Sequence, residues 1–158
     1  MADIHIDDFC RDTARTLLQL YGAFPRPQAV YVEDIAGPDE PDDVGLHSRR
    51  HMACLGTLLW LGDEGYLRHT GLIYQDGIEQ AVLTQRAFLV LSHILHAAAL
   101  PHSDAAAPMA EALRNVLRTG TSADITTLVR HFLALGGKQA ADRRGSGAAD
   151  DTTAANFT

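Results

Sequence analysis

Cysteine is scarce in this chain, with two residues in 158. Cys10 and Cys54 stand far apart and form no Cys-x-x-Cys pair, so the sequence predicts neither a disulfide framework nor a zinc ribbon. We expect both to be reduced and packed as small apolar side chains. The longest mostly apolar run, residues 87–100, contains two histidines and is too short to cross a bilayer. The N-terminal residues are acidic and lack the basic and then apolar segments of a signal peptide. We therefore expect a cytoplasmic protein that is not bound to a membrane.

Motifs of catalysis are also missing. The sequence contains no nucleophile elbow, phosphate-binding loop or dinucleotide fingerprint. Asp63 and Glu64 are neighbouring carboxylates, but they stand at an expected helix end, where solvent exposure explains them. We therefore expect no enzyme, no catalytic residue and no cofactor.

Basic residues are outnumbered, with 13 Lys and Arg against 20 Asp and Glu and a formal net charge of −7. Proteins that bind nucleic acid usually carry a basic face, because neutralising phosphates supplies most of their non-specific affinity. The acidic excess is concentrated in residues 33–43, which hold six carboxylates and no lysine or arginine. Residues 45–100 are balanced, with four arginines against four acids. A local basic patch is therefore compatible with the negative total.

The central part of the chain, residues 55–91, carries the most informative pattern. Leucines recur at helical spacing and predict a helix. Gly65 follows them and is the candidate for the left-handed residue that ends this helix. β-prone residues then flank Asp76 and Gly77, a pair that predicts a type I′ hairpin turn. Thr84 follows as the expected N-cap of a new helix.

This run, from LLWLGDEGYL through the hairpin to LTQRAFLVL, resembles winged helix-turn-helix proteins. The resemblance covers about residues 30–95 and does not select a subfamily. It implies that the helix before the hairpin is a recognition helix and that the hairpin is a wing. It also implies DNA binding in most such proteins and protein docking in a minority. The loop AGPDEPDDVG stands where a second helix is expected, so we expect that helix to be very short, about residues 42–46, or to be replaced by a loop.

We thus expect a mainly α protein with a small β-wing (α+β), in which a winged-helix core, residues 1–100, precedes a C-terminal α-hairpin, residues 103–137. The hairpin is a candidate for dimerisation or partner docking, or it simply packs on the core, and Gly136-Gly137 is its expected end. Residues 138–158 are small and polar and are expected to be disordered. Asp7 is the expected cap of the first helix. The expected elements of the core are helix one at 7–21, a strand at 29–35, the recognition helix at 46–64, the wing at 66–83 and a helix at 84–99.

A basic footprint is the first candidate site. Its expected members are His47, Ser48, Arg49, Arg50 and His51 of the recognition helix, Arg68, His69 and Gln75 of the wing, and Arg86 of the next helix. Arginine can grip guanine through two hydrogen bonds, and the start of a recognition helix faces base edges. The footprint predicts a homodimeric, bacterial-type transcriptional regulator that reads double-stranded DNA with helix residues 47–58 and wing residues 68–80.

Another interpretation stays open for the same residues. Arg49 and Arg50 are then solvated, or they neutralise the acidic loop that precedes them. The chain would then be an acidic winged-helix adaptor that binds a protein partner through residues 33–43 or through the C-terminal hairpin.

A metal site is the second candidate. His47, His51 and Cys54 recur at helical spacing, Asp43 stands nearby, and all four are zinc-ligand types. However, structural zinc sites usually draw ligands from two elements, and Cys54 is expected to face the core. We therefore expect no metal site, and a metal- or pH-responsive switch on the two histidines is the third hypothesis.

Overall fold

The structure is a computed structural model that describes residues 3–147. Its helices are α1 (Ile4–Ala23), α2 (Val32–Ala36), α3 (Arg49–Asp63), α4 (Gln85–Ser92), α5 (Met109–Thr119) and α6 (Ser122–Gly147), with a 3₁₀ turn η1 (Ala97–Ala99). Its strands are β1 (Gln28–Tyr31), β2 (Leu67–Arg68), β3 (Gly71–Ile73), β4 (Gly77–Leu83), β5 (Ile94–Leu95) and β6 (Ala107–Pro108). The protein is therefore mainly helical with a small antiparallel sheet, and the predicted α+β class is confirmed.

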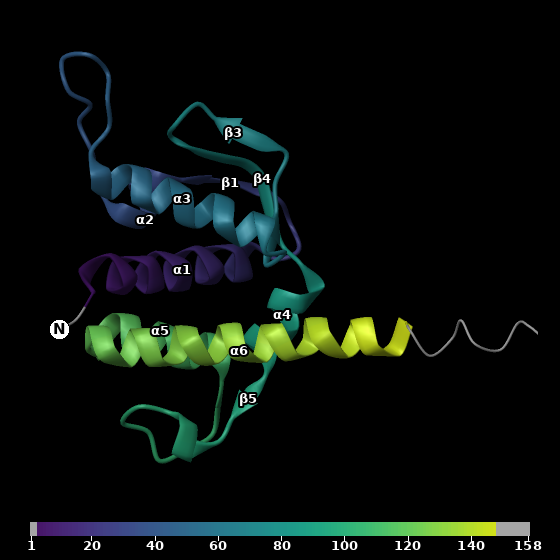
Figure 1. Ribbon diagram of the computed structural model, residues 1–158. Coiled ribbons are helices and arrows are strands. Elements are labelled where there is room, and N and C mark those ends of the chain that lie inside the picture. Colours follow the sequence, from purple (N-terminus) through teal and green to yellow (C-terminus); the bar gives the residue numbers. More distant parts are fainter. Residues whose placement is uncertain (1–2, 148–158) are drawn as a thin grey trace, which may run out of the picture.

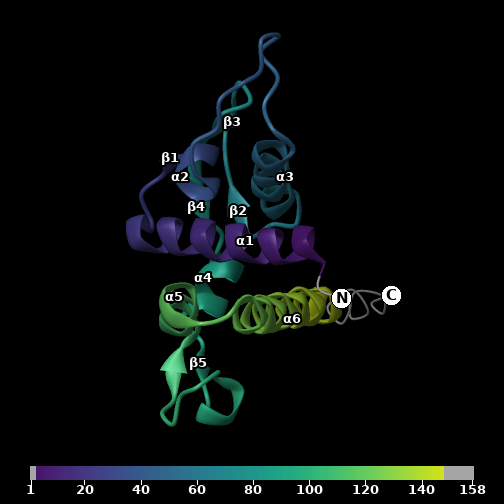
Figure 2. The ribbon, with the colours of Figure 1, turned by 90° about the vertical axis from the view of Figure 1, so that its left-hand side faces the viewer.

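Helix α1 is the central layer of the molecule. It lies between α3 and the sheet on one side and α5 and α6 on the other (Figures 1 and 2). Leu17 and Leu20 are buried along it, and Cys10 and Cys54 are both free and buried, as predicted. The prediction that Asp7 caps the first helix is wrong, because the helix already begins at Ile4. The Asp7 carboxylate instead accepts a hydrogen bond from the Thr126 hydroxyl at 3.1 Å, which ties α1 to α6.

The first strand is shorter than predicted, and of the two alternatives for residues 42–46, a very short helix or a loop, the loop is correct. Strand β1 ends at Tyr31, and the chain forms α2 within the expected strand of residues 29–35, not at residues 42–46. Val32 and Ile35 stand one helical turn apart and are both buried, so a helix hides both on one face. Residues 37–48 then form the loop that leads into α3.

Strand β4 is the centre of the sheet and pairs antiparallel with β1, β2 and β3. The turn of the β3–β4 hairpin is not at Asp76-Gly77 as predicted. The chain reverses at residues 74–76, where Tyr74 has a φ of 47° and the Asp76 amide donates to the Ile73 carbonyl at 2.9 Å. Gly77 is needed for a different reason, because a Cβ there would overlap the carbonyl oxygen of Val30.

Two signals at the borders of the hairpin are confirmed. Gly65 follows the C-terminal end of α3 with a φ of 76°, the left-handed conformation that the sequence predicts. The Thr84 hydroxyl accepts a hydrogen bond from the Ala87 amide and so caps α4. However, α4 ends at Ser92 and not at residue 99, because the chain turns into the β5–β6 ribbon.

The C-terminal helices differ most from the prediction. Helix α6 continues through Gly136 and Gly137 to Gly147, so the expected helix end is wrong, and residues 138–147 are helical where disorder was expected. The remaining part of the expected tail, residues 148–158, lies outside the described residues. Helix α6 packs along α1 and α4 and is part of the main core. Within residues 3–147, no helix combines the length and apolarity needed to cross a membrane.

Gly136 permits a close contact between α6 and the end of the hairpin. A Cβ at this position would lie 2.7 Å from Cε1 and 2.8 Å from the hydroxyl oxygen of Tyr66, which is itself buried. The neighbouring Gly137 is exposed, and a Cβ there would meet no atom within 4 Å. The two glycines therefore have different roles in one helix.

Alanine substitutions at this pair should have opposite effects on the free energy of unfolding. Gly136→Ala should lower it by about 1–3 kcal/mol, because the Tyr66 ring must move. Gly137→Ala should raise it by about 0.5–1 kcal/mol, because alanine favours a helix interior. Urea titrations of both variants check this, and a stabilising Gly136→Ala would contradict the packing of α6 on Tyr66.

Candidate functional site

The N-terminal end of α3 gathers the most polar group of side chains. The Ser48 hydroxyl caps the helix and accepts a hydrogen bond from the His51 amide at 3.1 Å. The Asp39 carboxylate, from the preceding loop, accepts from the Ser48 amide at 3.1 Å and from His47 Nδ1 at 3.0 Å. These bonds fold the acidic loop onto the start of the helix.

Asp39 is fixed in its charged form. Hydrogen bonds from Ser48 and then His47 lower the pKa of its carboxyl group to about 2. The group is therefore a carboxylate at neutral pH. The loop keeps its shape through Asp42, whose side chain accepts from the amides of Val44 and Leu46 at 3.0 and 2.8 Å.

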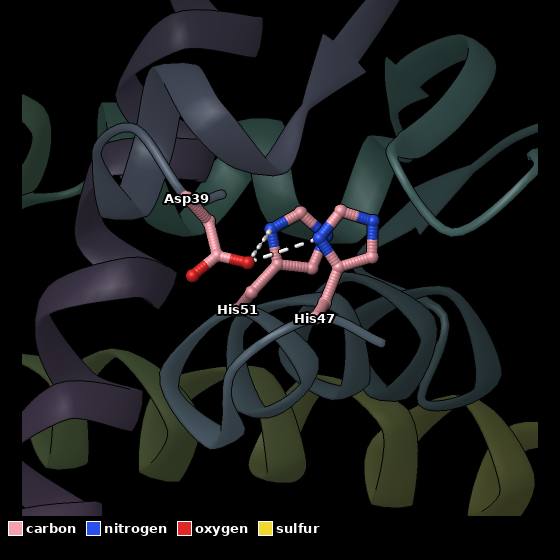
Figure 3. A group of neighbouring side chains, drawn as sticks. All are labelled: Asp39, His47 and His51. Atoms are coloured by element: carbon pink, nitrogen blue, oxygen red, sulfur yellow. Dashed lines mark hydrogen bonds and ion pairs between the residues drawn. The ribbon is translucent and has the colours of Figure 1, made fainter. Parts of the chain in front are cut away.

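His51 lies one helical turn after His47, and the two rings stack with centroids 3.8 Å apart and planes 6° from parallel. The His51 side chain is 5% exposed. Its Nε2 lies 2.7 Å from the carbonyl oxygen of Gln75. Because a carbonyl only accepts, Nε2 carries the proton of this bond. Figure 3 shows the opposite ring nitrogen, Nδ1, turned toward Asp39, with 3.8 Å between Nδ1 and Oδ2.

We call Asp39, His47 and His51 the histidine–aspartate cluster. Their possible ligand atoms all lie within 4.8 Å of one another. His47 Nε2 also lies 3.4 Å from the Asp76 carboxylate, so the turn of the hairpin closes the cluster from the other side. The cluster opens into a pocket of about 290 Å³ that Tyr31 and Glu33 also line.

The cluster differs from the four zinc-ligand residues that the sequence brings to mind, His47, His51, Cys54 and Asp43. His47 and His51 do lie together, but Cys54 and Asp43 do not join them. Cys54 is fully buried on the side of α3 that faces α1, and burial raises the pKa of its thiol to about 12. Asp39 could not be found from spacing, because the path of the loop decides which of its four acids reaches the helix.

Arg50 is not available to DNA in this structure. Its Nη1 and Nη2 donate to the two carboxylate oxygens of Asp12 at 2.7 and 2.6 Å, and its Nε lies 3.7 Å from Asp8. The Asp12 side chain is 1% exposed and that of Arg50 33%, so this two-pronged ion pair removes the carboxylate from water and covers most of the arginine. Arg50 is thus a structural link between α3 and α1.

The other predicted DNA contacts are dispersed. Arg86 donates to the Glu64 carbonyl and lies over the Tyr66 ring, with 4.1 Å from its guanidinium carbon to the ring centroid. The His69 ring packs against Gly62, and the Gln75 carbonyl is bound by His51.

Ser48, Arg49 and Arg68 are exposed, and Ser48 acts as the helix cap. Arg49 and Arg68 lie near opposite ends of α3. This helix has 15 residues and is therefore about 20 Å long. The compact basic footprint that the sequence predicted is therefore not formed.

The solvent-facing side of α3 is apolar. Met52 and Trp60 are 40% and 38% exposed, and the small residues Ala53 and Gly56 between them are also exposed. Ala53, Gly56 and Trp60 border a groove together with Phe9, which contacts Trp60 edge-on with ring centroids 5.3 Å apart.

We call this the α1–α3 groove, about 420 Å³, lined by Ile6 and Phe9 of α1 and Ala53, Gly56 and Trp60 of α3. The groove was not among the predicted sites, although Ala53, Gly56 and Trp60 recur at helical spacing on the side of the helix opposite the leucines.

Comparison of the chain with models of protein families, with curated proteins and with solved structures gives no significant match. The two sites are therefore interpreted from their own chemistry.

Two neighbouring arginines of α3 should respond differently to alanine. Arg50→Ala leaves the Asp12 carboxylate buried without its partner, so we expect a loss of about 2–4 kcal/mol in the free energy of unfolding. Arg49→Ala removes an exposed side chain and should change it by no more than about 0.5 kcal/mol. Chemical denaturation of the two variants compares them, and equal small effects would show that Arg50 is solvated.

Proposed function

We propose that this chain is a winged helix-turn-helix protein whose third helix docks protein and not DNA. The single observation that carries the proposal is the apolar, small-residue face that α3 presents to solvent. The docking partner that this face fits best is a second copy of the chain.

The order of elements supports the winged-helix part of the proposal. Helix α1, strand β1, helices α2 and α3 and the β3–β4 hairpin follow one another in the order that the family resemblance implies. The hairpin turn lies beside the start of α3, where the His51–Gln75 hydrogen bond holds it. Figure 2 shows the hairpin and the loop of residues 37–48 rising at the same end of the molecule.

The surface of α3 argues against DNA reading. A helix that reads bases needs donors and acceptors on its exposed face, especially near its start. This face offers Arg49 and then Met52, Ala53 and Gly56. Carboxylates also surround the start of the helix, where Asp39 and Asp76 contact His47 and would repel phosphate.

The α1–α3 groove is suited to a helix from another chain. Ala53 and Gly56 form the base of the groove and have little or no side chain. A Cβ at Gly56 would meet no atom within 4 Å, so the backbone of a partner can approach closely. Ile4 and Trp60 project beside it, with Ile4 75% exposed. A two-fold interface requires a surface that fits a copy of itself, and this face offers both projections and a hollow for such a fit.

The charges beside the groove also favour a second copy. Asp3, His5, Asp8 and Arg49 line the adjoining surface, so both signs are present on one rim. An antiparallel copy can therefore bring acids of one chain close to Arg49 of the other.

Anisotropy titration of a labelled random duplex tests the DNA part of the proposal. We expect no binding even at low salt. The carboxylates around the start of α3 repel phosphates, so the protein would neutralise few of them. Binding that weakens steeply as salt is raised would contradict the proposal and restore the DNA interpretation.

The intrinsic fluorescence of Trp60, the only tryptophan, tests the docking part. Self-association should bury Trp60, so its emission should shift to shorter wavelength as protein concentration rises, in step with the mass measured by sedimentation. Gly56→Gln should abolish both changes because a long side chain fills the groove floor. Gly137→Gln is the matched control on an exposed helix position and should leave them intact. A monomer at all concentrations, or a dimer that Gly56→Gln leaves unchanged, would refute the docking face.

A further inference from the structure

We propose that the histidine–aspartate cluster is a binding site for a first-row transition-metal dication, of which zinc is the best match. Two imidazoles and one carboxylate are donors that Zn²⁺ accepts, and three protein ligands leave a coordination position open. The donors come from two segments, the acidic loop and the start of α3, which is what the Cys54 set lacked. This proposal does not depend on the docking face.

The distances in the cluster match the size of a metal ion. Tetrahedral Zn²⁺ with bonds of about 2.0–2.1 Å holds its ligand atoms about 3.3 Å apart. Asp39 Oδ2 lies 3.0 Å from His47 Nδ1 and 3.8 Å from His51 Nδ1, on either side of that value. Both distances therefore lie within about half an ångström of the separation that a bound ion requires.

His51 points to a cation most directly. Its Nε2 proton is used by the Gln75 carbonyl, which leaves a lone pair on Nδ1 in the neutral ring. Nδ1 is buried and, among the residues that the structure describes, has no hydrogen-bond partner. It faces the Asp39 carboxylate, which is also an acceptor, and two acceptors face each other favourably only with a proton donor or a cation between them. A metal ion is such a cation.

The surroundings of both rings have the pattern of a second coordination shell. A histidine that binds metal through one nitrogen usually donates its other N–H to a carboxylate or a backbone carbonyl. With Nδ1 as the ligand atom, His51 Nε2 donates to the Gln75 carbonyl at 2.7 Å and His47 Nε2 faces the Asp76 carboxylate at 3.4 Å. Both acceptors belong to the turn of the β3–β4 hairpin.

Metal binding requires two local changes. The proton that His47 Nδ1 donates to Asp39 must leave that nitrogen, so that the N–H of the ring lies on Nε2 beside Asp76. The two imidazole planes are parallel, whereas a metal ion lies close to the plane of each ring it binds, so the His47 ring must rotate about its Cβ–Cγ bond. The rotation exchanges the contact of His47 with Asp39 for a bond to the metal, while the hydrogen bond to Gln75 fixes His51. The positive N-terminal end of α3 opposes a cation, and the carboxylates of Asp39, Asp76 and Glu33 around the pocket offset that effect.

The expected consequence is a metal clasp between three segments. An ion bound to Asp39, His47 and His51 joins the acidic loop to α3 directly, and it holds the hairpin through Gln75 and Asp76. The ion would thereby fix the position of the hairpin relative to α3.

Calorimetric titration of the full chain with Zn²⁺ tests the site, with Co²⁺ absorption as a second probe. We expect one Zn²⁺ per chain and visible Co²⁺ bands of a tetrahedral site. Asp76→Asn should weaken Zn²⁺ binding about 10-fold as a loss in the second shell, and Asp39→Asn should weaken it further. Asp43→Asn is the matched control, because it removes one charge from the same exposed loop but no contact with the cluster, and should change the affinity less than about twofold.

A second measurement uses only the wild-type protein, so it tests the site even if the variants fold poorly. In ¹⁵N-labelled wild-type protein, one equivalent of Zn²⁺ should shift the Nδ1 resonances of His47 and His51 and leave those of His93 and His96 unchanged. No Zn²⁺ binding by the wild type, or wild-type affinity in Asp39→Asn, would overturn the proposal. Zinc-induced shifts at other histidines alone would overturn it as well.

Discussion

The ion pair between Arg50 and Asp12 is the constraint on which the arrangement of α3 depends. Asp12 is almost fully buried in the central helix α1, and Arg50 binds both of its carboxylate oxygens. An isolated buried carboxylate is costly, so α3 is held in the one rotation that brings Arg50 to it. Cys54, Leu58 and Leu61 then face inward with Arg50, which agrees with their complete burial.

This rotation assigns a role to each remaining side of α3. His47 and His51 face the loop and the hairpin turn, where Asp39, Gln75 and Asp76 surround them. Gly56 and Trp60 face solvent beside α1. The proposed metal site and the proposed docking face thus follow from the same buried contact. Of the two neighbouring arginines expected to contact DNA, Arg50 is the one whose guanidinium this contact engages.

Local sequence predicted those parts of the fold that short-range chemistry decides. The spacing of leucines located α3, and Gly65 and Thr84 marked its end and the start of α4, because left-handed backbone and capping depend on neighbouring residues. Features that depend on distant contacts were not predictable in this way. Gly77 was interpreted as a turn residue, but it is required by the approach of Val30, and Gly136 is required by Tyr66.

The candidate site shows the same division. The four-residue spacing of His47 and His51 indicated a shared face, and the structure places their rings in contact. Asp39 joins them because its loop folds back onto the cap of α3, and no periodicity signals that return. Arg50 was interpreted as a DNA contact because its partner, Asp12, stands 38 residues earlier in the sequence. The sequence shows which charges exist, and the tertiary fold decides which of them are neutralised.

A double-mutant cycle between Asp12 and Arg50 tests the central constraint most directly. The free energy of unfolding would be measured for Asp12→Asn, Arg50→Gln and the double variant. If the ion pair holds α3 against α1, the effects are not additive, and the coupling energy should be about 2 kcal/mol or more. Additive effects, with a coupling energy near zero, would show that the rotation of α3 is set by apolar packing alone and would contradict this account.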